Sequence, residues 1–202
     1  VMATFAMSEA LTIILKRNDP TAAAKQVSLT ELGSIKIEKE DRKKMYKTIP
    51  RSSVIGFLIG VLPGAGATIA SFLAYGMERN LVNDDEKQKF GKGSVNGLSA
   101  PETANNAACS GSFVPMLTLG IPGSGTTAVM LGALLGFGVQ PGPRLYMTNP
   151  EIFWSIIMSM YIGMVILLIL NLPLIPYIAR ILAVPKNYLI PLILFFSITG
   201  IY

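Results

Sequence analysis

Two short segments of this sequence share a helix-breaking pattern whose chemistry suits ion binding. Residues 62–68 read LPGAGAT and residues 121–127 read IPGSGTT, so apolar, Pro, Gly, small, Gly, small and Thr recur in the same order. Proline removes a backbone donor and glycine accepts positive φ, so Pro-Gly-x-Gly should end a helix. At membrane depth such a break frees carbonyl groups on one side and presents a positively polarised helix N-terminus on the other. Transporters use these N-termini for anions and the unwound carbonyls for cations.

The two breaks supply most of the candidate binding residues. Those expected to contact a bound solute or ion are Gly64, Gly66, Thr68, Gly123, Ser124, Gly125 and Thr126, with Pro63 and Pro122 as structural residues. The alternative is that both segments are tight turns of helical hairpins. In that case Gly56-x-x-x-Gly60 and Gly132-x-x-x-Gly136 serve helix packing. Ser124, Thr126 and Thr127 would then cap the following helix.

A polar helix is expected between the two breaks. Ser99 and Glu102 fit the capping-box spacing S-x-x-E and predict that a helix begins there and runs through Ser110. Asn105 and Asn106 follow in this helix, and an amide can both ligate a cation and donate to a carboxylate. The alternatives are that Glu102 only caps the helix and that the two asparagines bond to neighbouring helices.

Composition indicates the elements that must position these residues. Only 14% of the 202 residues are charged, against about 25% in ordinary soluble domains, and 51% are hydrophobic. Residues 52–77, 103–143 and 152–179 contain no charged side chain. Because about 20 apolar residues span a bilayer as a helix, we predict an all-α polytopic membrane protein.

The charge pattern divides the chain into seven segments. We expect the end of a membrane helix at 1–15, a basic cytoplasmic loop at 16–51, a broken or re-entrant helix at 52–77 and a polar loop at 78–100. Broken helices with the Asn- and Ser-rich site follow at 101–143, a transmembrane helix at 152–179 and the start of a further one at 187–202. Since the chain begins with Val1 and stops inside an apolar run, we expect it to be part of a longer subunit.

Several other classes of protein are disfavoured. The chain has no histidine, so it has no Ser-His-Asp triad, Cys-His dyad or His-based metal site, and one cysteine forms no internal disulfide. A Walker A motif needs glycine where Glu86 stands, which removes an ATPase signature. The basic residues lie beside hydrophobic spans, as in membrane loops, rather than on a nucleic-acid surface. We therefore expect neither an enzyme nor a cofactor, and an ion gradient as the energy source.

Six short motifs of the sequence are similar to those of a known family. They are GVLPGAGAT at 60–68, FGKG at 90–93, APETANNA at 100–107, VP at 114–115, LGIPGS at 119–124 and PGP at 141–143. Together they resemble the large membrane subunit of the tripartite tricarboxylate transporter family. The similarity is strong over residues 54–146 and extends to the remaining spans by hydropathy. Gly125 departs from the family pattern, in which alanine is more usual at this position.

The resemblance implies a secondary transporter in the bacterial cytoplasmic (inner) membrane. A periplasmic solute-binding protein would deliver a di- or tricarboxylate to this subunit and a small membrane subunit, with sodium ions or protons as the coupling ion. The family's large subunit looks like two related halves forming an inverted repeat, of which this chain would be mostly the second. The candidate residues would then hold carboxylate and cation, with a sodium site near Asn105 and Ser124.

Two other functions remain open. Helix breaks rich in Gly and Pro also build ion-channel filters, and saturable uptake capable of counterflow would exclude a channel. A non-transporting structural membrane subunit is the other alternative. Uptake that survives Asn105→Ala and Ser124→Ala would favour it.

Overall fold

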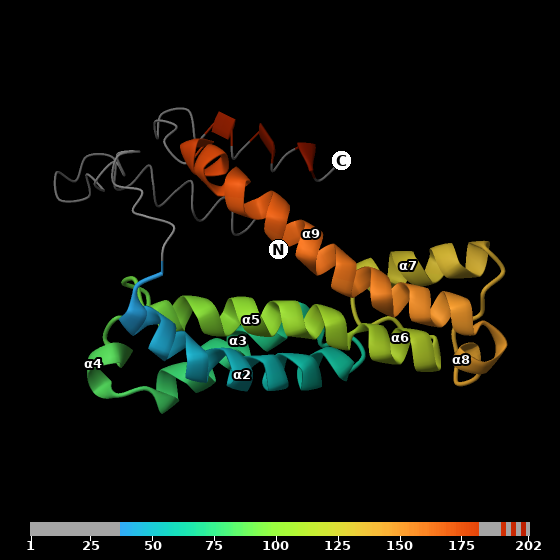
Figure 1. Ribbon diagram of the computed structural model, residues 1–202, viewed down its shortest axis with the longest axis horizontal. Coiled ribbons are helices and arrows are strands. Elements are labelled where there is room, and N and C mark those ends of the chain that lie inside the picture. The colour runs from blue at the N-terminus through green and yellow to red at the C-terminus, as the bar shows by residue number, and fades with distance from the viewer. Residues whose placement is uncertain (1–36, 182–190, 193–194, 197–198, 201–202) are drawn as a thin grey trace. The chain divides into compact units, whose positions relative to one another are not determined.

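The computed structural model describes residues 37–181, 191–192, 195–196 and 199–200, and all regular structure in these ranges is α-helical (Figure 1). In chain order the helices are α2 (Lys39–Val61), α3 (Gly66–Leu81), α4 (Asp84–Lys87), α5 (Val95–Gly111), α6 (Phe113–Leu119), α7 (Gly125–Gly136), α8 (Leu145–Thr148) and α9 (Pro150–Ile181). This agrees with the expected all-α class. The expected helix end at 1–15 lies outside the described residues, as does most of 187–202. Residues 37–161 belong to one compact unit, and α9 beyond Tyr161 belongs to another.

Three helices of the first unit, α2, α3 and α5, pack side by side (Figure 1). Gly56 lies against Ala104 and Gly60 against Ala108, so α2 and α5 run in the same direction. A Cβ atom on either glycine would overlap the facing backbone carbonyl oxygen. Small side chains therefore let the helix backbones approach closely, as in membrane proteins. The buried apolar residues of this bundle are Ala70, Ala74, Ala104 and Ala108.

Helices α2 and α3 form an antiparallel hairpin whose tip is the first Pro-Gly break. The Arg51 and Glu78 side chains, at the two open ends of the hairpin, form an ion pair with Nη2 and Oε1 2.7 Å apart. Because both ends lie together, residues 52–77 fold back on themselves as a hairpin. The expectation of a broken or re-entrant membrane helix for this segment stays a prediction. Each apolar arm is about 15–18 Å long at 1.5 Å per residue, which is about half of a bilayer core.

The described residues of the two segments expected to be polar loops are largely helical. The described part of 16–51 forms the first half of α2, and 78–100 includes the end of α3, the short α4 and the start of α5. Helices form here because Lys, Arg and Glu are good helix formers, so charge separates membrane spans without ending helices. The expected location of these segments outside the membrane stays a prediction.

The expected helix start at Ser99 was wrong. Helix α5 begins at Val95, and Ser94 is its N-cap, with Ser94 Oγ accepting from the Gly97 N–H at 3.0 Å. The positive φ angles of Gly91 and Gly93 turn the chain immediately before Ser94, which places the cap there. Ser99 and Glu102 therefore lie inside the helix, and neither caps it.

The second break separates α6 from α7. Gly120, in the left-handed conformation (φ 69°), ends α6, and α7 begins at Gly125. The break expected at Pro122–Gly125 is thus confirmed and begins slightly earlier. A second apolar cluster packs against α7 and the first turns of α9. Its buried residues are Met116, Leu117, Val139 and Leu145.

Helix α9 includes the expected transmembrane helix at 152–179. Its segment Pro150–Ile175 has a mean hydropathy of 2.4 and is long and apolar enough to cross a bilayer. It is the one such helix among the described residues, and α7 is apolar but shorter. The expectation of several crossings stays a prediction.

Candidate functional site

The two Pro-Gly breaks lie together and line one cavity of about 680 Å³. Among the sequence-predicted residues, those that line it are Gly64, Gly66, Thr68, Pro122, Gly123, Ser124, Gly125 and Thr126. The cavity also contacts Ala67, Cys109, Ser112, Phe113, Thr127 and Ala128, which the sequence reasoning did not single out as binding residues. Tertiary packing has therefore brought the two copies of the repeat to one place.

Local backbone geometry explains the glycines of the first break. Gly64 has φ 80° and Gly66 has φ 69°, values that L side chains rarely adopt. The turn is closed by the Ala65 N–H, which donates to the Leu62 carbonyl oxygen at 3.2 Å. Helix α3 then begins at Gly66, and the first N–H groups of a helix have no partner within it. The first break thus presents free donors at the cavity.

The second break is held by a capping box at the start of α7. Ser124 Oγ accepts from the Thr127 N–H at 3.2 Å, and Thr127 Oγ1 accepts from the Ser124 N–H at 2.8 Å. The capping alternative is therefore correct for Ser124 and Thr127. Thr126 is exposed and, within the described residues, its hydroxyl forms no hydrogen bond, so this hydroxyl is free to meet a ligand.

Close packing of Gly123 explains why the two breaks adjoin. Gly123 is buried, and a Cβ atom built on it would lie 2.9 Å from Ser112 Cβ and 3.4 Å from the Gly60 carbonyl oxygen. Gly60 belongs to α2 just before the first break, and Ser112 joins α5 to α6. A side chain at position 123 would push the second break away from the first.

Asn105 and Asn106 do not line this cavity. Asn105 Nδ2 donates to Ser71 Oγ of α3 at 3.2 Å, which is the interhelical bond considered as the alternative. Asn106 is exposed and donates to the Glu102 carbonyl oxygen of its own helix at 3.0 Å. Glu102 is exposed as well. The expected sodium site near Asn105 and Ser124 is therefore not assembled from these two side chains around one cavity, because Cys109 rather than Asn105 faces it from α5.

The opposite end of the bundle holds a buried polar cluster that sequence reasoning missed. Glu78 has no exposed surface, and its Oε1 accepts from Thr48 Oγ1 at 2.7 Å and from Asn96 Nδ2 at 3.2 Å, besides its ion pair with Arg51. Glu78 was taken as the first residue of a loop. The four-residue spacing of Thr48, Ser52, Gly56 and Gly60 was the signal that α2 extends back to face it.

A second acidic side chain at that end, Glu86, is held in its charged form. Burial raises the pKa of Glu86, but hydrogen bonds from Lys44 Nζ and Ser94 Oγ outweigh it and leave the pKa below 4.5. The Lys44 Nζ lies 3.1 Å from Oε2 and the Ser94 Oγ 3.0 Å from Oε1. The hydrogen bond to Glu86 in turn raises the pKa of Lys44 above 10.5.

The cavity between the breaks has no charged side chain in its lining. What it offers is backbone N–H groups of two helix N-termini, threonine and serine hydroxyls, and carbonyl groups of two unwound segments. The N-termini carry about half a positive charge each and favour an anion, while the carbonyl and hydroxyl oxygens are ligands for a hard cation. Such a lining is suited to reversible binding rather than to proton transfer between side chains.

Comparison with known proteins gives one family. The chain matches the model described as "Tripartite tricarboxylate transporter TctA family" over residues 1–202. The Agrobacterium vitis protein described as "Uncharacterized 52.8 kDa protein in TAR-I ttuC' 3'region" is 40% identical over 186 residues, which are 92% of this chain and 37% of that protein. Another protein of that organism, "Uncharacterized protein in TAR-II ttuC' 3'region", is 46% identical over 147 residues, or 73% of this chain and 60% of that protein. The chain thus spans less than two thirds of either relative, and no solved structure matches it significantly.

Proposed function

Because the chain belongs to the tripartite tricarboxylate transporter TctA family, as its motifs indicated, we propose that it forms part of a membrane subunit that imports di- or tricarboxylates. The family is one of membrane transporters rather than of enzymes. Import would be symport with sodium ions or protons. It would depend on a small membrane subunit and on a periplasmic solute-binding protein in the bacterial inner membrane system.

One observation supports this proposal most directly, namely the shared cavity of the two Pro-Gly breaks. The N-termini of α3 and α7 both open at it, and Gly66 and Gly125 are their first residues. A carboxylate placed there would meet two positively polarised helix ends without any lysine or arginine. Binding without a fixed positive charge is weak enough to permit release, as transport requires.

The depth of the cavity is consistent with a transport site. The apolar arms of the α2–α3 hairpin extend about 15–18 Å from the charged end, so its tip would lie near the middle of a bilayer about 30 Å thick. Secondary transporters place substrate and coupling-ion sites near the midplane, where unwound helices are tolerated because they line a cavity. The coupling cation would bind the carbonyl groups of the same unwound segments.

The test is uptake by the complete transporter. The full-length subunit, its small subunit and its binding protein are reconstituted in proteoliposomes, and labelled citrate uptake is followed with and without an inward sodium gradient. A proton gradient and a panel of other carboxylates are run in parallel. We expect gradient-dependent, saturable uptake of at least one carboxylate. Uptake of none under either gradient would contradict the proposal.

Site variants connect uptake to the cavity. Thr126→Val and Thr68→Val each remove an exposed hydroxyl that forms no hydrogen bond within the described residues, so the fold should tolerate them. A hydrogen bond to a charged group contributes about 1.5–3 kcal/mol, so half-saturation should rise at least about tenfold. Thr148→Val, whose hydroxyl donates to the Arg144 carbonyl oxygen outside the cavity, is the matched control. Unchanged uptake in both cavity variants would place the substrate elsewhere.

A further inference from the structure

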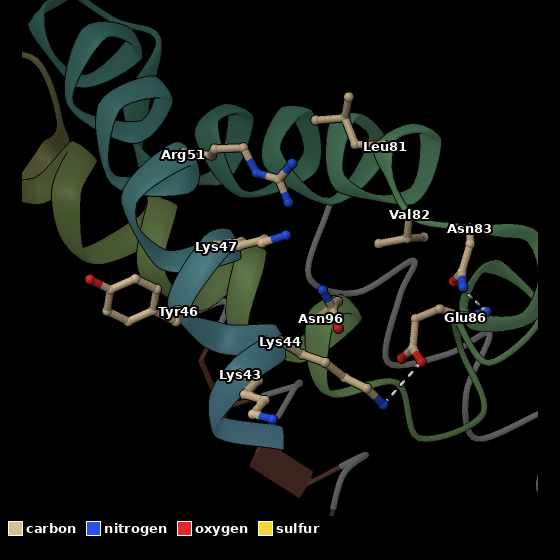
Figure 2. Close-up of a pocket in the computed structure, with 10 residues that line it drawn as sticks. All are labelled: Lys43, Lys44, Tyr46, Lys47, Arg51, Leu81, Val82, Asn83, Glu86 and Asn96. Atoms are coloured by element: carbon tan, nitrogen blue, oxygen red, sulfur yellow. Dashed lines mark hydrogen bonds and ion pairs between the residues drawn. The ribbon is translucent and has the colours of Figure 1, made fainter. Parts of the chain in front are cut away.

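A second pocket of about 730 Å³ lies at the charged end of the three-helix bundle, away from the cavity between the breaks (Figure 2). Helix α2 contributes four cationic side chains to its lining, Lys43, Lys44, Lys47 and Arg51. The facing wall comes from the end of α3 and from α4. Figure 2 shows Lys47 and Arg51 extending from α2 toward the segment that carries Leu81 and Val82.

The positive charge of this pocket is only partly neutralised. Lys44 pairs with Glu86, and Arg51 pairs with the buried Glu78. Lys43 and Lys47 are exposed and, in the part of the chain that the structure describes, have no carboxylate within 4.0 Å. The pocket therefore keeps two uncompensated positive charges.

A buried donor without an acceptor also lies at this pocket. The Nε of Arg51 is inaccessible to solvent and, like Glu78 Oε2, has no hydrogen-bond partner among the described residues, although Arg51 Nη2 binds Glu78 Oε1. A buried unpaired donor is costly, and guanidinium donors suit the planar or tetrahedral oxygens of carboxylate and phosphate. Because 39% of the Arg51 side-chain surface is accessible, the exposed part of its guanidinium can meet an anion beside the two lysines.

The pocket is also amphipathic and lies where the helices change from charged to apolar. Leu81 and Val82 form an aliphatic part of its lining. Beyond Arg51, α2 carries no charge and exposes apolar side chains such as Val54 and Leu58, each with 59% of its surface accessible. In a membrane protein, that change of character marks the bilayer surface. The pocket would thus open at the level of the lipid headgroups.

We propose that this pocket binds the phosphate headgroup of an anionic membrane lipid, with Lys43, Lys47 and Arg51 as its ligands. The acyl chains would extend past Arg51 along the exposed apolar side chains of α2, such as Val54 and Leu58, a contact that a free phosphate or a small carboxylate cannot make. Basic pockets between membrane helices are suited to such headgroups, and each lysine near the surface adds to the attraction. The site requires a membrane location but does not depend on the proposed carboxylate transport.

The test measures lipid binding by the full-length subunit together with its small subunit in detergent. Native mass spectrometry quantifies bound phosphatidylglycerol and phosphatidylcholine in titrations without substrate. We expect clear preference for phosphatidylglycerol, and about a tenfold or greater loss of its affinity in Lys43→Gln/Lys47→Gln. The matched control, Lys39→Gln/Arg42→Gln, removes the same charge from the same helix at positions outside the pocket and should retain affinity within about twofold.

Two results would overturn the proposal. Equal losses in the two double variants would mean that lipid is held by diffuse attraction to the basic end of α2 rather than by this pocket. Stabilisation of the protein against heat by inorganic phosphate alone, removed by Lys43→Gln/Lys47→Gln, would reassign the site to a soluble anion. Because no uptake is measured, failure here is distinguishable from failure of the transport proposal.

Discussion

The two ends of the α2–α3–α5 bundle differ in the partners of their polar groups. At one end, Glu78 Oε1 accepts bonds from Thr48, Arg51 and Asn96, while Glu78 Oε2 and Arg51 Nε have no partner among the described residues. At the other end, α2 ends at Val61 and α3 begins at Gly66, and the break between them leaves backbone groups facing a cavity. One end is a buried polar cluster of side chains joined mainly through Glu78 Oε1, and the other is a set of backbone and hydroxyl groups that face a cavity.

The difference indicates which end is suited to a transported solute. Groups that are already paired hold helices together, because a buried hydrogen-bonded carboxylate is stable only with all its donors in place. Groups that are unpaired in a cavity can exchange protein, water and solute as partners at little cost. Between the two ends, the contacts of Gly56 with Ala104 and of Gly60 with Ala108 fix the position of α2 along α5.

The largest expected effect comes from removing the carboxylate of the buried polar cluster. Glu78→Ala leaves the Arg51 charge and the donors of Thr48 and Asn96 without their acceptor, so it should destabilise the protein by about 3 kcal/mol. Thermal unfolding in detergent measures the change. Glu102→Ala removes an exposed acid from α5 and should cost less than about 0.5 kcal/mol. Equal destabilisation by the two variants would show that the buried polar cluster does not stabilise this end of the bundle.

The next effect tests the small-residue contact between the two ends. Gly56→Ala would place a Cβ atom against the Ala104 carbonyl oxygen and should destabilise the protein by about 1–3 kcal/mol. Gly132→Ala is the matched control from the other GxxxG motif, since nothing lies within 4 Å of a Cβ atom there. That control should be neutral or stabilising by up to about 1 kcal/mol, because alanine favours a helix. Destabilisation by Gly132→Ala instead would contradict this assignment of the two motifs.

A smaller effect separates capping from binding at the cavity end. Ser124→Ala and Ser94→Ala each remove the N-cap of one helix, α7 or α5, which should lower stability by about 1 kcal/mol. Ser94→Ala should cost somewhat more, because the Ser94 hydroxyl also donates to Glu86. Only Ser124 lines the cavity between the breaks. We therefore expect Ser124→Ala to reduce carboxylate uptake well beyond the loss seen with Ser94→Ala. Equal uptake in the two variants would limit Ser124 to its structural role.

The smallest effect is the pH dependence of the Lys44–Glu86 pair at the charged end. Because the pKa of Glu86 is lowered, its contribution to stability is present above pH 4.5 and is lost as the pH falls through its folded-state value. Because the pKa of Lys44 is raised, its contribution is present below pH 10.5 and is lost as the pH rises beyond it. The unfolding midpoint of Lys44→Gln should lie below that of the wild type near neutral pH. The two should converge in acid, and a constant difference at all pH values would contradict the ion pair.

Much of the cavity site was predictable, because the Pro-Gly-x-Gly pattern acts locally. Positive φ at Gly64 and Gly66 and the cap at Ser124 are determined by neighbours in the chain. The asparagines were less predictable, since the face that Asn105 presents depends on how α5 packs against α3. The cap of α5 was misplaced because two serines, Ser94 and Ser99, both precede plausible helices, and only the glycine turn distinguishes them.

The sequence by itself determined the family, the all-helical class and the two points where helices must break. These follow from local chemistry, since missing N–H groups and glycine φ angles act within a few residues. Only the tertiary structure decided that the two breaks share one cavity, that 52–77 folds back into a hairpin, and that Glu78 is buried beside Arg51. Those facts arise from contacts between residues distant in sequence. They depend on close approach at Gly56, Gly60 and Gly123, whose small size permits many packings and whose chosen partners no local pattern specifies.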